Sequence, residues 1–413
     1  MAELGRRAKA ASRVLATAST DQKDEALLAA AHLLGERRAE ILEANAADVA
    51  RAEGEGVSAT LVDRLRLTEA RLESMAGGLR QVAALPDPVG EVVAGWVRPN
   101  GLRIRQVRVP LGVVAIVYEA RPNVTSDAAG LCIKAGNAAF LRGSSSTLSS
   151  NIAIASALRA GFAKAGLPED SLVMVEDTRY EAAVEFMQLR DSIDCLIPRG
   201  GPGLIAAILE HATVPYVIDG DGNCQIYVDE SADLAMAVDI VVNAKTQRPS
   251  VCNAAESLIV HEAVAGELLP RVAEALLARD VELVGDAAAR AIVGEPMADA
   301  GDDDFSTEFL ALKIAIGVVP SLDAAIAHVN RHSSGHTEAI VTESLRSAQR
   351  FTNEVDAAAV MVNCSTRFTD GEMFGFGAEI GISTQKLHAR GPMGLRELTT
   401  TKYVVEGTGQ IRS

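Results

Sequence analysis

The sequence predicts an α/β protein with two doubly wound domains, and three observations support this fold class. Residues 1–85 carry apolar side chains at helical spacing and show no strand pattern. From residue 111 onward, short apolar runs alternate with helical stretches, as in a parallel sheet that helices cover on both faces. The chain has 413 residues. Single hydrophobic cores stop growing at about 250–300 residues, so more than one domain is needed.

The first block is expected to consist of amphipathic helices. Its opening segment has Arg, Ala and Ser in the proportions of a transit peptide but lacks a hydrophobic h-region. The apolar residues there share one helical face instead: Leu4, Ala8, Ala11, Val14 and Leu15. A second stripe runs through Leu27, Ala30, Ala31, Leu34, Leu61, Leu65, Leu72 and Leu79. We therefore expect the first helices of a cytoplasmic protein.

A β-hairpin that projects as an arm is expected at residues 95–110. Pro99-Asn100-Gly101 separates two apolar segments, and the second alternates apolar residues with arginines. Asn-Gly supplies the two positive-φ positions of a type I′ turn, which joins twisted antiparallel strands well.

The alternating segments form two series that join near residues 220–230. In the first series we expect strands at Val113–Tyr118, Ala138–Leu141, Leu172–Val175, Cys195–Ile197 and Tyr216–Ile218, with helices at 125–135, 147–165, 180–190 and 203–211. In the second we expect strands at Ile226–Val228, Leu258–Val260, Ile314–Val319, Ala339–Val341 and Ala358–Val362, with helices at 232–245, 262–278, 322–330 and 343–354.

Composition and charge exclude several classes of protein. The chain has 39 Lys and Arg against 55 Asp and Glu, a formal charge of −16, which disfavours nucleic acid and anionic membranes as partners. No apolar run approaches the ~18–20 residues that span a bilayer. The five cysteines form no C-x-x-C motif, which is typical of a reducing compartment and disfavours a disulfide framework or a zinc site.

Two patterns resemble metal sites, but we expect no metal. His328, His332 and His336 would line up on one helix, yet Ser333-Ser334-Gly335 should end that helix before His336. The acidic stretch 299–304 lacks the spacing and the glycine of a calcium-binding EF-hand loop.

Cys252 is the strongest candidate nucleophile. It lies in a predicted loop between a helix that ends near Lys245 and a strand, with Arg248 nearby, and partial exposure beside cations favours the thiolate. The alternative is an ordinary small apolar residue. Cys364, at the end of a strand, is its nearest competitor. Cys132 and Cys195 fall in apolar runs and should be buried, whereas Cys224 stays undecided.

Three further loops follow strands at the edge where parallel sheets bind ligands. In Glu119–Thr125, Asn123 offers an amide to an oxyanion or, alternatively, caps the next helix. Arg142-Gly143-Ser144 suits a phosphate or a ribose at a helix start. Arg199-Gly200-Gly201 allows close backbone approach to a pyrophosphate, although its spacing is not G-x-G-x-x-G. Together the last two of these loops indicate a dinucleotide site.

The order of these segments resembles the aldehyde dehydrogenase superfamily from about residue 5 to the C-terminus. The most specific passages are Val117–Thr125 (VYEARPNVT), Gln247–Asn253 (QRPSVCN), Phe374–Thr384 (FGFGAEIGIST) and His388–Leu395 (HARGPMGL). The resemblance implies an aldehyde dehydrogenase-like fold with a Rossmann-like NADP-binding domain (1–94 and 111–227), an α/β catalytic domain (228–394) and a small β oligomerisation arm (95–110 and 395–413).

The resemblance also implies roles for individual residues. Cys252 matches the catalytic cysteine, and Asn123 matches the amide of the oxyanion hole. Arg142 falls where the superfamily usually has a Lys at the adenosine ribose, and an Arg there suits the 2′-phosphate of NADP. The remaining cofactor contacts are expected from Gly143, Ser144, Arg199, Gly200, Gly201 and, at the nicotinamide ribose, Glu308.

Within the superfamily, the chain is most similar to the subgroup that reduces L-glutamyl 5-phosphate with NADPH in proline biosynthesis. Hydrolytic members carry a Glu that activates water, but Ile218–Gly222 has none, although Asp219 or Asp221 remains as a possible base. This departure favours a reductase over the alternative, a hydrolytic or CoA-acylating dehydrogenase. The resemblance further implies a homo-oligomer and an association with glutamate 5-kinase. Arg121 and Ser383-Thr384 are guesses for the substrate's α-carboxylate and ammonium.

Overall fold

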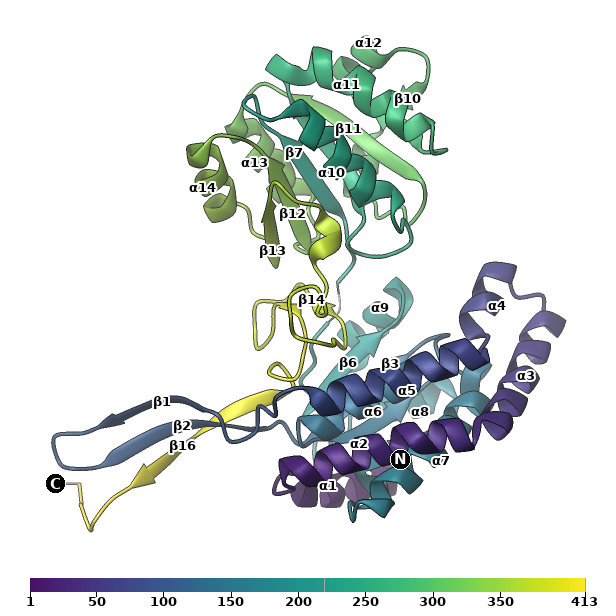
Figure 1. Ribbon diagram of the computed structural model, residues 1–413, viewed down its shortest axis with the longest axis vertical. Helices are drawn as coiled ribbons and strands as arrows, with labels where there is room; N and C mark the ends of the chain where they lie inside the picture. Colours follow the sequence, from purple (N-terminus) through teal and green to yellow (C-terminus); the bar gives the residue numbers. More distant parts are fainter. Residues whose placement is uncertain (219, 413) are drawn as a thin grey trace. The chain divides into compact units, whose positions relative to one another are not determined.

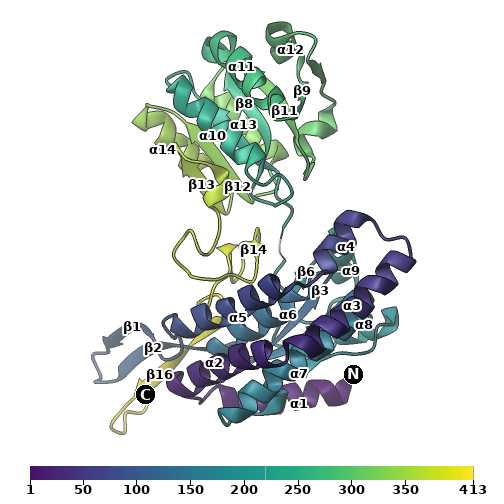
Figure 2. The same cartoon turned by 45° about the vertical axis from the view of Figure 1, so that its right-hand side comes forward.

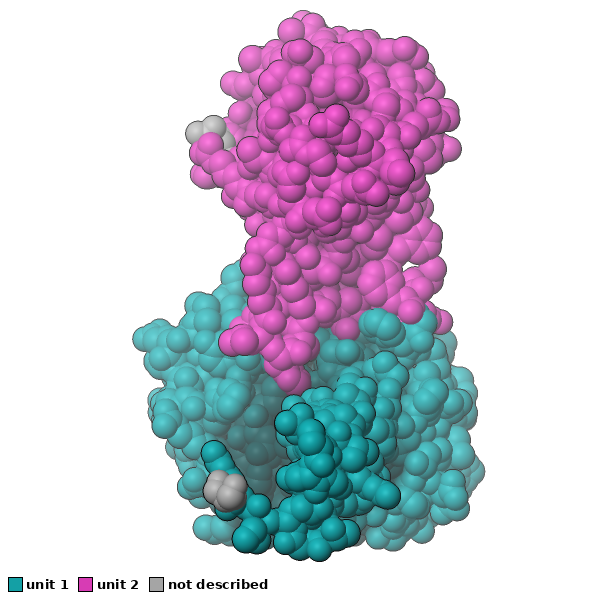
Figure 3. Space-filling view, turned by 90° about the vertical axis from the view of Figure 1, so that its left-hand side faces the viewer, with its two compact units in different colours: residues 1–218, 375–381, 393–413 teal, residues 219–374, 382–392 magenta. Residues whose placement is uncertain are grey.

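The computed structural model describes residues 1–218 and 220–412, apart from the side chains of Thr60 and Asp302. The chain divides into two compact units (Figure 3). Unit 1 comprises Met1–Ile218, Gly375–Gly381 and Met393–Ser413, and unit 2 comprises Asp219–Phe374 and Ile382–Pro392. The division therefore falls at Ile218 rather than at residue 227, and two pieces of the expected catalytic segment 228–394 pack with unit 1.

Unit 1 begins with the helical block. Its helices are α1 (Ala2–Leu15), α2 (Thr20–Glu36), α3 (Arg38–Gly54), α4 (Ala59–Leu65) and α5 (Glu69–Ala84). Ser19 and Thr68 cap α2 and α5, because each side-chain oxygen accepts a backbone N–H of the first turn. The predicted stripe is buried except for Leu61, which is 41% exposed, and Val14 of the opening face is 48% exposed.

A four-stranded parallel sheet forms the core of unit 1, in the order β5-β4-β3-β6 (Figure 1). The strands are β3 (Val113–Tyr118), β4 (Ala138–Arg142), β5 (Leu172–Met174) and β6 (Cys195–Arg199), and α6 (Asn123–Lys134), α7 (Leu148–Lys164) and α8 (Tyr180–Met187) connect them. This order is that of half a Rossmann fold, with the switch point between β3 and β6. The predicted strand Tyr216–Ile218 is wrong: after α9 (Pro202–His211), the chain makes a single β-bridge from Tyr216 to Leu196.

The arm is a separate antiparallel sheet of β1 (Val92–Val97), β2 (Arg103–Pro110) and β16 (Thr399–Glu406) (Figure 1). The type I′ turn is wrong, because only Gly101 of the two turn residues has a positive φ, +87°. Its N–H donates to the Arg98 carbonyl at 2.9 Å. Pro99 and Asn100 are therefore the central residues of the turn. Proline is favoured at the first central position of a type I turn, which explains the difference.

Unit 2 is built on a seven-stranded parallel sheet, in the order β10-β9-β11-β8-β7-β12-β13 (Figure 2). Its strands are β7 (Cys224–Val228), β8 (Ala255–His261), β9 (Glu282–Gly285), β10 (Met297–Asp299), β11 (Lys313–Val319), β12 (Thr337–Val341) and β13 (Ala359–Val362). Its helices are α10 (Leu234–Thr246), α11 (Glu262–Leu277), α12 (Ala287–Val293), α13 (Leu322–His332) and α14 (Leu345–Glu354). The short elements β9, α12 and β10 were missing from the sequence prediction.

The remaining elements are short. Four 3-10 turns, η1 (Ser145–Thr147), η2 (Glu169–Ser171), η3 (Asp302–Ser306) and η4 (Thr366–Phe368), and the pair β14 (Ile382–Ser383) and β15 (Gly391–Pro392) complete the fold. The helix α13 ends at His332, two residues beyond the predicted bound but before His336 as expected, and Gly335 turns the chain with a φ of +79°. No helix in the described ranges is long and apolar enough to cross a membrane.

Candidate active site

Cys252 lies in a short loop between α10 and β8, and its side chain is partly exposed. The next residue anchors this loop. The Asn253 amide donates to the Thr369 carbonyl at 2.9 Å, and the Thr366 hydroxyl donates to the Asn253 carbonyl at 2.7 Å. These hydrogen bonds fasten the loop to η4 and to the residue that follows η4, while Cys252 before Asn253 stays partly exposed.

The glycine segment after residue 219 packs directly on the backbone of Cys252. A Cβ on Gly222 would lie 1.7 Å from the Cys252 carbonyl oxygen, so no larger residue fits there. The Gly222 N–H donates to Glu308 Oε1 at 2.8 Å. The backbone of Gly222 therefore places Glu308 beside the Cys252 loop.

Glu308 keeps the capacity to bind a ligand in this position. Burial raises the pKa of Glu308, and the hydrogen bond from the Gly222 N–H lowers it by a smaller amount. A carboxylate accepts hydrogen bonds at both oxygens, so the contact with Gly222 leaves room for a ribose hydroxyl.

The segment that holds Ser383 and Thr384 belongs to the same part of unit 2. A Cβ on Gly220 would lie 2.3 Å from the Thr384 hydroxyl, so the two chain segments touch. Ser383 is buried, and its hydroxyl accepts the Gln385 N–H at 3.2 Å. Asp221 is exposed, and Asp219 lies outside the described residues.

A buried ion pair between two residues that flank the Cys252 loop in the sequence was not foreseen. Lys245 Nζ lies 2.5 Å from Glu256 Oε2, and neither side chain has any exposed surface. Glu256 Oε1 also accepts the Leu310 N–H, at 3.3 Å. Lys245 is therefore paired with Glu256, and its support of the Cys252 thiolate stays a prediction. Burial lowers the pKa of Arg367, and its Nε donates to Gln247 Oε1 at 2.8 Å, so this second cation lies against the loop that carries Cys252.

Three of the other four cysteines are buried, and the pKa of each of the four thiols is raised. Cys132 and Cys195 are buried as predicted, and so is the undecided Cys224. Burial raises the pKa of the Cys195 thiol to about 12 and raises those of Cys132 and Cys224. Cys364 is partly exposed, but its thiol donates to Met361 Sδ at 3.6 Å and burial raises its pKa.

In unit 1, two of the predicted loops meet at the switch point between β3 and β6. Glu119 follows β3, and its carboxylate accepts the Gly201 N–H at 3.0 Å, directly before α9. A Cβ on Gly200 would lie 2.7 Å from the same carboxylate, so a larger residue there would displace the Glu119 side chain. Arg199 ends β6 beside them.

Asn123 does not cap a helix. It is the first residue of α6, Pro122 is the N-cap, and no side chain caps this end. The Asn123 amide is exposed and donates to Asp127 Oδ2 at 2.9 Å. Its second amide hydrogen remains for a ligand, since an Asn side chain has two donors.

The third loop follows β4. The Arg142 guanidinium donates to the Thr178 and Arg179 carbonyls at 3.2 and 3.0 Å, while its Nε is buried with no hydrogen-bond partner among the described residues. A Cβ on Gly143 would lie 2.2 Å from the Asn151 amide nitrogen, and the Ser144 hydroxyl contacts that of Ser146 at 2.6 Å. Glycines without room for a side chain and an unsatisfied guanidinium Nε fit a phosphate-bearing cofactor.

Residues 2–317 and 305–404 match the sequence profile of the Aldehyde dehydrogenase family. The chain belongs to this family. It is an oxidoreductase, and its fold agrees with the predicted aldehyde dehydrogenase-like class. Members of the aldehyde dehydrogenase family use nicotinamide cofactors, which agrees with the predicted cofactor class.

Relatives within the aldehyde dehydrogenase family are close over the full length. The chain is 55% identical to the gamma-glutamyl phosphate reductase of Clostridium beijerinckii, over 99% of this chain and 98% of that protein. The enzyme of the same name from Moorella thermoacetica is also 55% identical, over 99% of this chain and 97% of its own. The crystal structure of gamma-glutamyl phosphate reductase from Thermotoga maritima matches with a TM-score of 0.98 at 50% identity, covering 100% and 99% of the two chains.

Proposed function

We propose that this protein reduces L-glutamyl 5-phosphate with NADPH to L-glutamate 5-semialdehyde and phosphate. The observation that carries the proposal is the near-complete match to proteins named gamma-glutamyl phosphate reductase. The site supports it, because a partly exposed cysteine lies beside a glycine segment that has no glutamate to activate water. An acyl phosphate that is converted to a thioester and then reduced needs no hydrolytic water.

The reaction begins at Cys252. Its thiolate attacks the acyl carbon, the tetrahedral intermediate collapses, and inorganic phosphate leaves with the electrons of the C–O bond, so that a thioester remains. When bound, NADPH supplies the hydride that reduces this thioester. The resulting thiohemiacetal then breaks its C–S bond, which releases the aldehyde and regenerates the thiolate. Arg367, near Cys252, helps to keep the sulfur anionic between turnovers.

The developing oxyanion needs donors that are in place before the attack. We propose the Cys252 backbone N–H and the Asn123 amide for this role. Each such donor is typically worth about 3–4 kcal/mol of the activation barrier. Asn123 belongs to unit 1 and Cys252 to unit 2. The contribution of Asn123 to the oxyanion hole therefore stays a prediction, which an Asn123→Ala variant tests.

Running the reaction backwards tests the proposed function. Purified protein is mixed with glutamate 5-semialdehyde and NADP, with and without phosphate, while NADPH absorbance is followed. We expect NADPH only when phosphate is present. NADPH formation from water or from CoA in place of phosphate would assign the chain to a hydrolytic or CoA-acylating dehydrogenase instead.

Arg142 is proposed to select NADPH over NADH. A guanidinium bound to a 2′-phosphate makes charge-assisted hydrogen bonds worth about 1.5–3 kcal/mol, which corresponds to about ten- to a hundredfold in affinity. We expect Arg142→Gln to raise the KM for NADPH by this factor and to leave that for NADH nearly unchanged. The exposed Arg190, changed to Gln, is the matched control. If the KM values for NADPH and NADH rose equally, Arg142 would act only by holding the backbone carbonyls of residues 178 and 179.

The arm is proposed to join copies of this chain. β1 and β16 are edge strands, and edge strands can pair with another chain. They expose five apolar side chains, Val93, Trp96, Val97, Tyr403 and Val405. Of these, Trp96, Tyr403 and Val405 lie on one face of the sheet, since Trp96 and Val405 both pair with Ile104. The Trp96 and Tyr403 rings meet edge to face, with their centroids 6.2 Å apart. An exposed apolar patch on projecting strands indicates an interaction surface.

We expect Tyr403→Asp to convert the oligomer to smaller species, since it places a charge in that apolar patch. Light scattering coupled to size-exclusion chromatography measures the mass. Tyr180→Asp is the control, because Tyr180 of α8 is similarly exposed, at 60% against 62% for Tyr403. An unchanged mass for Tyr403→Asp would remove the arm from the interface. The association with glutamate 5-kinase remains a prediction.

A further inference from the structure

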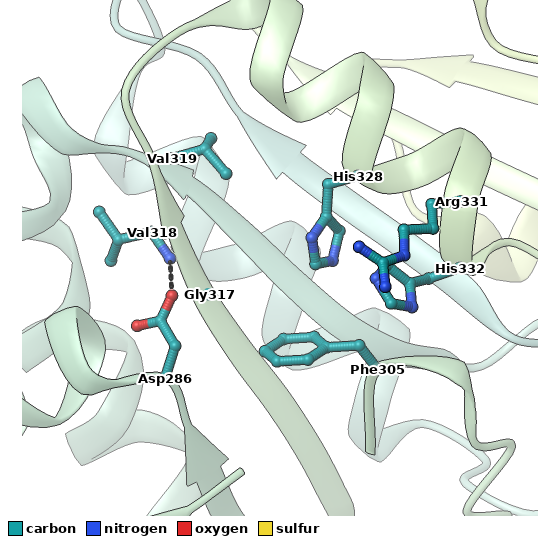
Figure 4. A pocket seen from close by; sticks show the side chains of 8 residues that line it. All are labelled: Asp286, Phe305, Gly317, Val318, Val319, His328, Arg331 and His332. Atoms are coloured by element: carbon teal, nitrogen blue, oxygen red, sulfur yellow. Dashed lines mark hydrogen bonds between the residues drawn. The ribbon is translucent and has the colours of Figure 1, made fainter. Parts of the chain in front are cut away.

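A small pocket lies on unit 2 between α13 and the ends of two strands (Figure 4). Its volume is about 220 Å³, and it is lined by Asp286, Phe305, Gly317, Val318, Val319, His328, Arg331 and His332. Pockets for drug-sized ligands hold about 300–1,000 Å³, so this one suits a smaller molecule. None of its lining residues has a role in the proposed reaction.

The pocket carries opposite charges at its two ends. Figure 4 shows Asp286 on one side of the Phe305 ring and Arg331 with His332 on the other. Arg331 is exposed and has no ion-pair partner within the described part of the chain. His332, on the same turn of α13, contacts the Ser306 hydroxyl at 2.8 Å through Nδ1. The Arg331 guanidinium could therefore form a charge-assisted hydrogen bond with a carboxylate at this end of the pocket.

The opposite end is a carboxylate held rigidly in place. Asp286 directly follows β9 and caps α12, so its Oδ1 accepts the Ala289 N–H at 2.8 Å. Its Oδ2 accepts the Val318 N–H, also at 2.8 Å. Each carboxylate oxygen can accept a second hydrogen bond. An ammonium group in the pocket would therefore meet a negative charge that two backbone donors have already oriented.

A neutral histidine and apolar surface lie between the charged ends. His328 Nε2 is buried and lacks a hydrogen-bond partner among the described residues. Burial lowers the pKa of His328 to about 4, so the ring is uncharged near neutral pH. The Phe305 ring meets that of His328 edge to face, at 5.1 Å between centroids, and Val319 adds an aliphatic wall. A buried polar atom without a partner is costly unless a water or a ligand satisfies it.

The pocket is distinct from the surroundings of Cys252. Its Asp286 end lies at the carboxyl edge of the parallel sheet, where β9 and β11 finish, whereas Cys252 precedes β8 and so lies at the amino edge. Its other end approaches the catalytic segment through Asn223, whose amide donates to the Phe305 and His332 carbonyls at 2.8 and 2.7 Å.

We propose that this pocket binds a small α-amino acid as its zwitterion, with the carboxylate at Arg331 and His332, the ammonium at Asp286 and the aliphatic side chain against Phe305 and Val319. An α-amino acid carries both charges on adjacent carbon atoms, and the pocket offers both counter-charges with an apolar wall between them. The inference is independent of the proposed reaction, because none of these groups takes part in it.

L-Valine and two analogues that each lack one of its charged groups test the proposal on the full-length protein without cofactor. L-Valine carries both charges, 3-methylbutanoate lacks the ammonium, and 2-methylpropan-1-amine lacks the carboxylate. Isothermal titration calorimetry and saturation-transfer NMR measure their binding. We expect saturable binding of one L-valine per chain and at least about tenfold weaker binding of each truncated probe, since each loses a charge-assisted contact.

Two arginine variants locate the binding. Arg331→Gln is expected to weaken L-valine binding at least about tenfold. Arg346→Gln, at an exposed arginine of α14, should leave it unchanged. Asp286→Asn tests the ammonium end, and its fold is checked by circular dichroism because Asp286 caps α12. The proposal is overturned if L-valine does not bind saturably, if it binds Arg331→Gln as tightly as Arg346→Gln, or if 3-methylbutanoate binds as tightly as L-valine.

Discussion

Replacement of Cys252 by alanine is expected to lower the turnover number by about 10⁴-fold or more, because the thioester can no longer form. The phosphate-dependent assay measures this loss. NADPH binding, followed by the fluorescence of the bound nicotinamide, should change little, since the proposed cofactor contacts other than Glu308 lie in unit 1. Loss of activity without loss of binding assigns the thiol to the chemistry rather than to the fold.

Cys364→Ala is the matched control for this experiment. Cys364 is also partly exposed in unit 2, and its thiol donates to the sulfur of Met361. We expect its activity to remain within a few-fold of the parent. A Cys252→Ala protein with more than a tenth of the parent activity would contradict the proposed covalent mechanism. Faster alkylation of Cys252 than of Cys364 by iodoacetamide would support it independently.

Lys245→Met is expected to destabilise unit 2 by about 3–5 kcal/mol, because it leaves the fully buried carboxylate of Glu256 without its partner. Amide hydrogen exchange of peptides from α10 and β8, read by mass spectrometry, reports this unit directly. A global unfolding curve would mix the transitions of two units. The variant should also lose activity, since Lys245 and Glu256 flank the Cys252 loop.

The matched control removes both charges. In the double variant Lys245→Met/Glu256→Gln, the amide oxygen can still accept the Leu310 N–H, and no buried charge remains. We expect it to recover at least half of the lost stability, as buried ion pairs are often replaceable as a unit. A double variant no more stable than Lys245→Met would mean that the lysine matters through packing rather than through charge.

The cost of Lys245→Met should depend on pH in a direction that follows from Glu256. Burial raises the pKa of Glu256 to about 7, above the ordinary value of 4.5, even with the lysine present. A carboxyl whose pKa is higher in the folded than in the unfolded state stabilises the fold when it is protonated. The protonated Glu256 carboxyl therefore makes its full contribution to stability below pH 4.5, and this contribution is lost as the pH rises through 7. Without the lysine the pKa rises further. The variant should therefore be less destabilised at pH 5 than at pH 8, and the reverse order would contradict this account.

Long elements with strong periodicity were predictable, and short elements were not. The strand Val113–Tyr118 was predicted at its observed bounds, because six consecutive apolar residues are buried on both faces of a parallel sheet. Glu282–Gly285, Ala287–Val293 and Met297–Asp299 were missed, since three to seven residues carry too little periodicity to separate a strand from a loop. Tyr216–Ile218 is apolar, but its pairing with β6 is limited to the single bridge between Tyr216 and Leu196, so it does not form a strand.

In the candidate site, too, some features were predictable from the sequence and others were not. By itself, the sequence identified a partly exposed cysteine, the loops after three strands and the resemblance to the aldehyde dehydrogenase family, because each of these depends on local order along the chain. Only the tertiary structure decided what each group meets. Lys245 and Glu256 are eleven residues apart and meet inside the fold, and Gly222 touches Cys252 from across the loop. Asp286 and Arg331 line one pocket from separate elements. Such contacts arise from the three-dimensional packing of strands and helices, which residue spacing alone does not encode.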